Sequence, residues 1–324
     1  IAINHDGSYL NSNYPIELNE KVYVGVALAD INDDGFDEII VGTKSAKLHI
    51  FDHSGNELQG FPYTATNDIR SAPVVSDIDF DGQYEIIFGD DDGNLICLDI
   101  NGNIKFITQL SNKIRMSPSI LYEQNNIYIF VGDTDGLLYS LDGNGNINEG
   151  WPINLGSDIL TSPIFADIEN DGYFEVVTTS YISGLSIFDK NGNSIHNFPI
   201  DDNQTTICSP TAYDIDIDGD VDLIYGTSAG LEIIDIKSSS TVSDWYTHRG
   251  NFLRNGKIDF DLEFIYGDTN LDGFINVIDI VNIVNHIIND NELSEISFLY
   301  SDMNFDEELN VLDIVIIVSL ILNE

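Results

Sequence analysis

Basic residues are scarce in this chain. Its 324 residues include 12 lysines and arginines against 55 aspartates and glutamates, and the formal net charge is −43. Nucleic acids carry a dense negative charge that attracts basic proteins, so a nucleic-acid partner is not expected for a chain with this balance.

Cysteine and long apolar runs are also rare. The two cysteines, Cys97 and Cys208, are far apart and suggest buried thiols rather than a disulfide framework. The most apolar stretch, residues 314–322, has nine residues, against the roughly 20 that a membrane-spanning helix needs. No membrane span is therefore predicted, and this stretch is expected to form an interface.

Acidic side chains are concentrated in four copies of one nine-residue loop: residues 30–38, 77–85, 167–175 and 214–222. Each copy has oxygen-bearing side chains at positions 1, 3, 5 and 9 and Gly at position 6, and each runs into an apolar, β-branched segment. Calcium takes about six to eight oxygen ligands and tolerates irregular geometry, so the pattern predicts calcium sites. The simpler alternative is that each Asp-Gly pair only marks a hairpin turn.

The spacing of the loops predicts the architecture. Successive loops begin 47, 90 and 47 residues apart, and the middle interval fits two repeats with one loop missing. In the incomplete repeat Tyr122 stands at position 1 and the Gly is absent, so that repeat is expected to keep its strands without a metal. A period of about 45 residues with four short strands is typical of a β-propeller blade.

Four strands can be placed in each repeat. One precedes the acidic loop, the second follows it (residues 38–42 and 85–89), and the third lies beyond a tight turn (residues 95–99 and 185–189). The last is expected near Phe61-Pro62, Trp151-Pro152 and Phe198-Pro199, where proline indicates an outer edge strand.

The acidic loops and the strand pattern of residues 1–240 resemble the FG-GAP/VCBS repeats, which form integrin-like propellers. The resemblance implies about four calcium ions, each held by side chains at positions 1, 3, 5 and 9 and by a main-chain oxygen at position 7. The implied ligands are Asp30, Asn32, Asp34, Phe36 and Glu38; Asp77, Asp79, Asp81, Gln83 and Glu85; Asp167, Glu169, Asp171, Tyr173 and Glu175; and Asp214, Asp216, Asp218, Asp220 and Asp222.

The two ends of the propeller admit two interpretations. Residues 2–18 align with the third and fourth strands of a repeat, whereas the last repeat, residues 206–235, shows three strands. The N-terminal strands could complete the last blade and close the ring, or the chain could be a piece of a longer propeller. We favour the second interpretation. The last repeat already has a third strand, so it offers no open place for the third strand that the N-terminal segment would bring along with the fourth.

Residues 241–261 form a linker or closing segment between two modules. They contain Arg249, Arg254 and Lys257, which are rare in this chain. We expect the arginines to pair with nearby acids; the alternative, a basic recognition patch, would lie inside a large negative field.

A second type of acidic loop is duplicated in residues 262–324. Residues 268–279 and 302–313 carry oxygen ligands at positions 1, 3, 5, 9 and 12, which is the spacing of an EF-hand calcium loop. Each loop leads into a helix, residues 280–288 and 314–322, with no helix before it. The second loop has Glu307 at position 6 where the first has Gly273, so its turn costs roughly 1 kcal/mol more and its site is expected to be the weaker.

Two such loop–helix half-hands resemble a type I-like dockerin domain, a small all-α module. The resemblance implies two calcium ions and a cohesin-like scaffold or surface partner, bound near loop positions 10 and 11 (Val277, Ile278, Val311 and Leu312). Type I dockerins often carry hydroxyl residues there. The alternatives are that the module contacts its own propeller or serves as a sorting tag. The implied ligands are Asp268, Asn270, Asp272, Phe274, Asn276, Asp279, Asp302, Asn304, Asp306, Glu308, Asn310 and Asp313.

Together these patterns predict a calcium-binding interaction protein that is mainly β. Six calcium ions would leave a formal charge of about −31, and such sites fill at millimolar calcium, so an extracellular or cell-surface location is expected. The spacing of the histidines suggests no catalytic set, which favours a binding platform for a polysaccharide or protein. The alternatives are a polysaccharide lyase built on the propeller, or the accessory part of a larger secreted hydrolase such as a protease.

Overall fold

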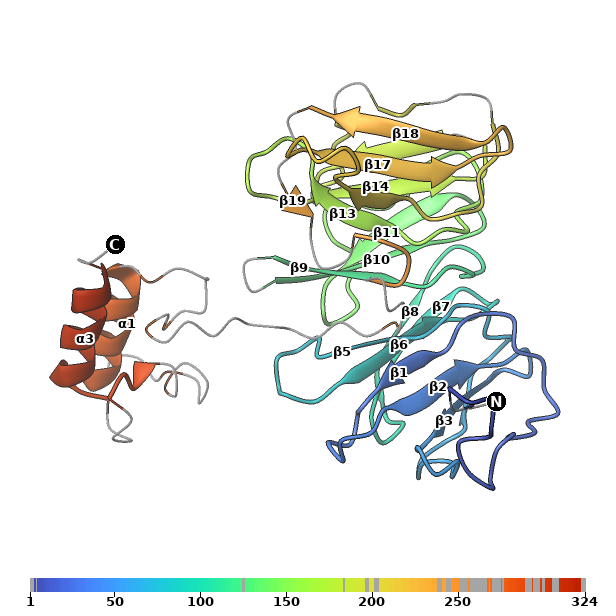
Figure 1. The fold of residues 1–324 in the computed structure, drawn as a ribbon, viewed down its shortest axis with the longest axis horizontal. Helices are drawn as coiled ribbons and strands as arrows, with labels where there is room; N and C mark the ends of the chain where they lie inside the picture. Colours follow the sequence, from blue (N-terminus) through green and yellow to red (C-terminus); the bar gives the residue numbers. More distant parts are fainter. Residues whose placement is uncertain are drawn as a thin grey trace. The chain divides into compact units, whose positions relative to one another are not determined.

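The computed structural model divides the chain into two compact units, Ile1–Asp259 and Phe260–Glu324 (Figure 1). The structure describes residues 3, 5–123, 126–182, 184–195, 198–200, 204–237, 241–242, 246–250, 256, 267, 269, 275, 277–288, 293, 298, 301–304 and 309–321.

The first unit is built from antiparallel sheets that follow one another along the chain (Figure 1). Within the described residues there are five sheets, which confirms the predicted mainly β fold of short-stranded propeller blades. The first sheet contains β1 (Ala27–Ala29), β2 (Glu38–Gly42), β3 (Lys47–Phe51) and β4 (Tyr63–Thr64), and the second contains β5 (Val74–Ser76), β6 (Glu85–Gly89), β7 (Asn94–Asp99) and β8 (Ile104–Gln109).

The remaining three sheets continue the same order. The third contains β9 (Ser119–Glu123), β10 (Asn126–Gly132), β11 (Leu137–Leu141) and β12 (Ile153–Asn154). The fourth contains β13 (Ile164–Asp167), β14 (Glu175–Ser180) and β15 (Gly184–Phe188), joined on the far side of β13 by β19 (Thr241–Val242), and the fifth contains β16 (Thr211–Tyr213), β17 (Val221–Gly226) and β18 (Leu231–Ile236).

The core lies between neighbouring sheets, because both faces of the inner strands are apolar. One cluster joins the first two sheets through Ile40, Ile50 and Phe88, all of them fully buried. The segment that connects the first two sheets packs closely on a glycine of β2, since a Cβ on Gly42 would lie 2.4 Å from Ile69 Cγ2. The apolar β-branched run after each acidic loop thus forms the second strand and the centre of the core.

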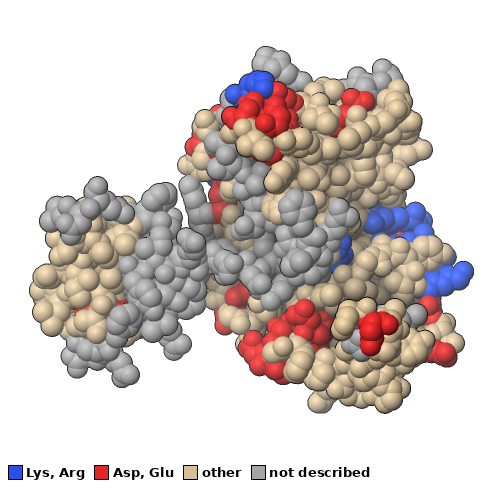
Figure 2. Space-filling view, in the orientation of Figure 1, with Lys and Arg blue, Asp and Glu red and all other residues tan. Residues whose placement is uncertain are grey.

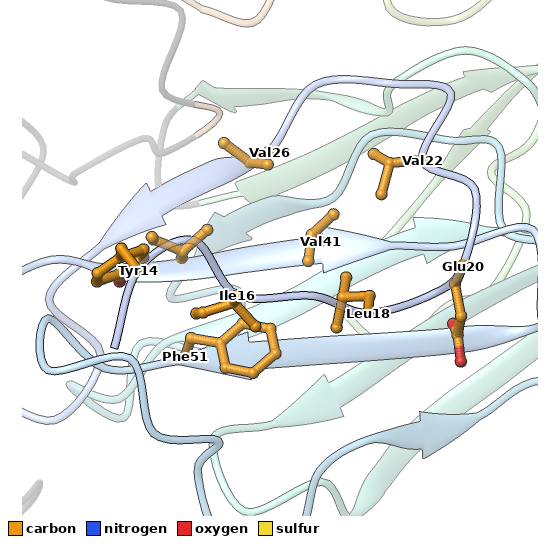
Figure 3. Close-up of a pocket in the computed structure, with 9 residues that line it drawn as sticks. Tyr14, Ile16, Leu18, Glu20, Val22, Val26, Val41 and Phe51 are labelled. Carbon is orange, nitrogen blue, oxygen red and sulfur yellow. The ribbon is translucent and has the colours of Figure 1, made fainter. Parts of the chain in front are cut away.

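The N-terminal segment lies against the first sheet. Asn11 Nδ2 donates to His53 O at 3.2 Å, and Thr43 Oγ1 donates to Glu20 Oε2 at 2.6 Å. Figure 3 shows Ile16 and Leu18 beside Phe51 in this covering layer, which leaves a cavity of about 360 Å³. The described N-terminal residues therefore do not complete the fifth sheet, as the ring-closing interpretation would require.

The fifth sheet keeps one apolar face open to solvent. Leu231 and Ile233 are 68% and 52% exposed, whereas the equivalent Leu185 and Ile187 of the fourth sheet are fully buried against the fifth. Three strands of the fifth sheet lie within the described residues, which matches the three strands expected from the sequence.

The described residues 241–242, 246–250 and 256 contact the first strands of several sheets. β19 pairs with β13, Tyr246 O accepts from Ala212 N at 2.9 Å, and Gly256 O accepts from Val75 N at 2.8 Å. Arg249 is 4% exposed and donates from Nη2 to Val26 O at 2.6 Å. Burial lowers the pKa of Arg249 to about 10. Arg249 Nη2 also donates to Pro73 O at 3.4 Å, so this side chain connects the entrances of the first two sheets through main-chain carbonyls.

The second unit is helical in its described part. It contains α1 (Val277–Ile287) and α3 (Val311–Ile321), which begin three residues earlier than the sequence pattern predicts. Ile283 and Ile317 are fully buried at equivalent positions of the two helices. The described part of this unit is thus a pair of duplicated helices, as the repeated loop–helix pattern predicts.

Candidate metal centres

The four acidic loops of the propeller unit share one backbone conformation. Position 6 is a glycine with φ between 82° and 95° in every loop, a region that residues with a Cβ rarely adopt. Position 4 also has a positive φ in every loop, at Asp33, Phe80, Asn170 and Ile217. The glycines at position 6 have no atom within 4 Å of an added Cβ, so conformation rather than space requires them.

In each loop the position 1 aspartate holds the turn together. In the first loop, residues 30–38, Asp30 Oδ2 accepts from Gly35 N at 2.8 Å, and Asp34 Oδ1 accepts from Phe36 N at 2.9 Å. Asp77, Asp167 and Asp214 accept from the glycine at position 6 in the same way. The carboxylates at positions 1 and 5 of the first loop therefore both accept from main-chain N–H groups of the turn.

The position 9 acid closes each loop from the second strand. One oxygen of this carboxylate accepts from the main-chain N of position 2, at 3.1 Å in Glu38, 3.0 Å in Glu85, 2.7 Å in Glu175 and 2.9 Å in Asp222. These side chains are at most 4% exposed. Each loop thus contains a buried carboxylate that is fixed through one of its oxygens to the main chain of the loop.

The first loop, residues 30–38, contains a buried carboxylate oxygen that has no described hydrogen-bond partner. Glu38 is fully buried, and within the described residues its Oε1 has no hydrogen-bond partner. Burial, with the nearby carboxylates of Asp34 and Asp30, raises the pKa of Glu38 to about 7. No described basic side chain forms an ion pair with this loop. A buried carboxylate oxygen without a partner, beside two further acids, has the chemistry of a hard-cation ligand.

The third loop, residues 167–175, has similar electrostatics and an adjoining pocket. Burial raises the pKa of Glu175 to about 7, and the carboxylates of Asp171 and Asp167 add to the effect. The pocket measures about 330 Å³, and Tyr173 in its lining is 41% exposed. Lys190 Nζ lies 4.4 Å from the centre of the Tyr173 ring and forms its ion pair with Glu123 rather than with the loop.

The fourth loop, residues 214–222, is the most exposed. Asp214, Asp216 and Asp218 present carboxylate oxygens within 4.8 Å of one another. Lys237, which is 67% exposed, reaches Asp218 Oδ2 at 3.2 Å from the edge of the loop. Figure 2 shows acidic side chains gathered in compact patches on the face in view, one of them over the fifth sheet beside basic side chains.

The acids of the second loop, residues 77–85, contact a residue from outside the loop that the sequence did not point to, Lys105. Asp77, Asp79 and Glu85 converge within 4.8 Å, but Lys105 Nζ lies between them, 2.5 Å from Asp79 Oδ2 and 2.6 Å from Glu85 Oε1. The signal in the sequence is weak, because Lys105 follows the loop by 20 residues, on β8.

In the repeat that lacks an acidic loop, the first and second strands pair with each other up to their adjoining ends. β9 ends at Glu123 and β10 begins at Asn126, with Tyr122 paired to Ile127 inside the sheet. The Tyr122 hydroxyl donates to Asp77 O at 3.0 Å and contacts Ser76 Oγ in the neighbouring sheet. The tyrosine at position 1 therefore serves the packing between sheets.

The two loops of the helical unit use the same closing contact as the propeller loops. Asp279 Oδ1 accepts from Thr269 N at 2.9 Å, and Asp313 Oδ1 accepts from Met303 N at 2.9 Å, so the last acid again binds the main chain of position 2. Both aspartates are fully buried. Asp302, Asn304 and Asn310 are also described; Asp268, Asn270, Asp272, Phe274, Asn276, Asp306 and Glu308 lie outside the described residues.

Both helices carry an exposed apolar stripe at equivalent positions. Ile278 and Val281 of α1 are 56% and 49% exposed, and Leu312 and Val315 of α3 are 59% and 54% exposed. No described helix is long and apolar enough to cross a membrane.

Two family models match parts of this chain. Residues 266–322 match the dockerin type I domain. Residues 64–150, which include the second and third sheets, match the lambda-carrageenase beta-propeller domain. Parts of the chain are therefore similar to a carrageenase-type propeller domain and to a type I dockerin domain, and the more specific FG-GAP/VCBS resemblance stays a prediction. Dockerin type I domains bind calcium and cohesins.

No match was found among curated proteins. Among solved structures, BamB from Moraxella catarrhalis is 16% identical with a TM-score of 0.46, covering 67% of this chain and 62% of its own. The computationally designed Ika8 protein is 14% identical with a TM-score of 0.46, covering 65% and 57%. BBS1N, in its complex with ARL6DN, is 15% identical with a TM-score of 0.47, covering 69% and 70%. The chain thus spans about three fifths of the length of the first two structures.

Proposed function

We propose that this protein is a secreted or cell-surface, calcium-binding interaction protein. Its propeller unit presents a binding surface, and its dockerin domain attaches that surface to a cohesin-like scaffold or surface protein. The dockerin match over residues 266–322 is the observation that carries the proposal.

The exposed stripes of α1 and α3 support docking to a protein. Ile278 and Leu312 occupy matching places, and each is more than half exposed. Apolar side chains in duplicated, solvent-exposed positions are a typical protein-binding surface. The partner is expected to offer an apolar face, because the stripe itself carries no charge.

Calcium is proposed to hold the loops of both units. Buried carboxylates such as Glu38 and Asp279 are costly without a cation or strong hydrogen bonds. The ion would neutralise the mutual repulsion of the loop acids, so its part is structural. Millimolar calcium outside cells fills such sites, which supports the proposed location.

Binding to cohesins tests the docking proposal. The full chain is titrated against a panel of immobilised cohesins in calcium and in EGTA, as the wild type and as the double variant Val281→Asp with Val315→Asp. Burying two carboxylates is expected to weaken a calcium-dependent complex at least tenfold, or about 1.4 kcal/mol. Leu320→Asp, on α3 but off the stripe, is the matched control and should bind as the wild type does. Binding unaffected by the double variant, or by EGTA, would contradict the proposal.

A polysaccharide is a candidate ligand of the propeller unit, and two observations favour it. One is the match to a lambda-carrageenase domain. The other is the pocket at the third loop, where an exposed Tyr173 stands beside Lys190 and several carboxylates. An aromatic face surrounded by polar groups suits a sugar ring.

Glycan binding and turnover separate the two roles of the propeller. Sulfated and uronate-containing polysaccharides are offered to the full chain with calcium, and binding, new reducing ends and ultraviolet-absorbing unsaturated products are measured. Binding without products supports a presentation platform, whereas either product would establish an enzyme.

A further inference from the structure

The second acidic loop differs from the first in the partner of its buried glutamate. In both loops one oxygen of the position 9 carboxylate accepts from the main chain of position 2, Ile31 or Ile78. In the first loop the other oxygen, Glu38 Oε1, has no partner among the described residues. In the second loop the equivalent oxygen, Glu85 Oε1, accepts from Lys105 Nζ at 2.6 Å.

Lys105 is surrounded by the carboxylates that would form the metal site. Its Nζ is also 2.5 Å from Asp79 Oδ2 and 3.7 Å from Asp81 Oδ2, so it contacts the acids of positions 3, 5 and 9 together. The side chain is 29% exposed, while Glu85 is 1% exposed. Hydrogen bonds from the lysine counteract the effect of burial, which raises the pKa of Glu85.

The first, third and fourth sheets have no basic residue at this sequence position. Lys105 lies six residues beyond Asp99, the acid that begins the turn after the third strand, and the corresponding residues in the first, third and fourth sheets are Leu58, Asn148 and Ile195. The basic residues near the other loops behave differently. Lys190 pairs with Glu123, and Lys237 is largely exposed at the rim of its loop.

We propose that Lys105 is a built-in substitute for calcium in the second loop, so that this loop stays folded without a metal while the first loop requires one. An ammonium group is a compact positive charge with three donors, which suits three converging carboxylates. A calcium ion would have to displace it and then lie close to a second cation. This inference rests on the proposed calcium binding of the propeller.

A matched pair of variants tests it. Asp34→Asn and Asp81→Asn change position 5 of the first and second loops, where each aspartate accepts from the main chain of position 7. Bound calcium per full chain is counted by elemental analysis after equilibrium dialysis at millimolar calcium. Asp34→Asn is expected to lose one ion relative to the wild type, and Asp81→Asn none. Lys105→Met, which keeps the length of the side chain without its charge, is expected to gain one ion.

The outcomes separate this inference from the function on which it rests. Loss of an ion in both aspartate variants would show that the second loop binds calcium despite Lys105, and would overturn the inference alone. No loss in either variant would count against calcium binding by the first loop itself. If Lys105→Met fails to fold, hydrogen exchange of the wild type supplies the third measurement. Protection of residues 77–85 should not change on adding EGTA, while that of residues 30–38 should fall.

Discussion

The propeller unit and the helical unit close their acidic loops with the same contact and support them differently. Glu38 in the propeller and Asp279 in the helical unit are both fully buried, and both accept from the main-chain N of position 2. The propeller loops stand between strands already held by large apolar clusters, whereas the described core of the helical unit has two fully buried apolar residues, Ile283 and Ile317. We therefore expect the same closed acidic loop to add to the stability of the propeller unit and to be the main source of stability in the helical unit.

Chelation should reveal this difference most strongly. Removing calcium with EGTA leaves repelling carboxylates in the loops that bind it, and we expect the described helical core, with Ile283 and Ile317 as its fully buried apolar residues, not to compensate. We expect the helical signal in circular dichroism to be lost at room temperature, while the strand signal remains and the propeller melts at a lower temperature. Magnesium added in place of calcium is the control. A helical signal and melting curve unchanged by EGTA would contradict both the comparison and the calcium sites.

Equivalent core truncations should have unequal consequences. Ile317→Ala and Ile87→Ala each remove a fully buried side chain and are expected to cost about 2–5 kcal/mol. Ile317 is one of the two fully buried apolar residues in the described part of the helical unit, so Ile317→Ala should abolish its folding. Ile87→Ala should only lower the melting temperature of the propeller. Limited proteolysis with mass spectrometry follows each unit separately, and equal resistance of the helical unit in both variants would show that the comparison is wrong.

The smallest expected effect is that of pH on the calcium-free propeller. Burial raises the pKa of Glu38 from 4.5 to about 7, so the folded state binds a proton more tightly than the unfolded state. The free energy of unfolding should then decrease as the pH rises from about 4.5 to about 7, because only the folded state must give up a proton in that range. Denaturant titrations in EGTA measure this slope. Glu38→Gln should reduce the slope and leave the part that comes from Glu175, and a free energy of unfolding that increases with pH over this range would exclude the effect.

The fold class followed from the sequence because its signals are local. The glycines at position 6, the alternation after each loop and the period of about 45 residues depend on neighbours in the chain, and the sheets appear where these patterns place them. The helices were predicted for the same reason, although α1 and α3 begin within the acidic loops. The calcium ligands themselves stay a prediction, since the pattern identifies oxygens but not the ion.

Features built from distant segments were not predictable. Arg249 reaches a carbonyl 223 residues away, at Val26, and no local pattern distinguishes that contact from a pair with a nearby acid. The position of the N-terminal segment on the first sheet depends on which apolar face it can cover, and both ends of the propeller offer one.

The sequence by itself determined the repeated strands, the two types of acidic loop and the duplicated helices, because each is specified by residues a few positions apart. Only the tertiary structure decided which loops contain a cation of their own. Lys105 belongs to an outer strand, and it enters the second loop because sheet pairing brings β8 alongside β7, across the sheet from the loop acids. The sequence specifies which side chains are charged, but the fold determines the distances between them.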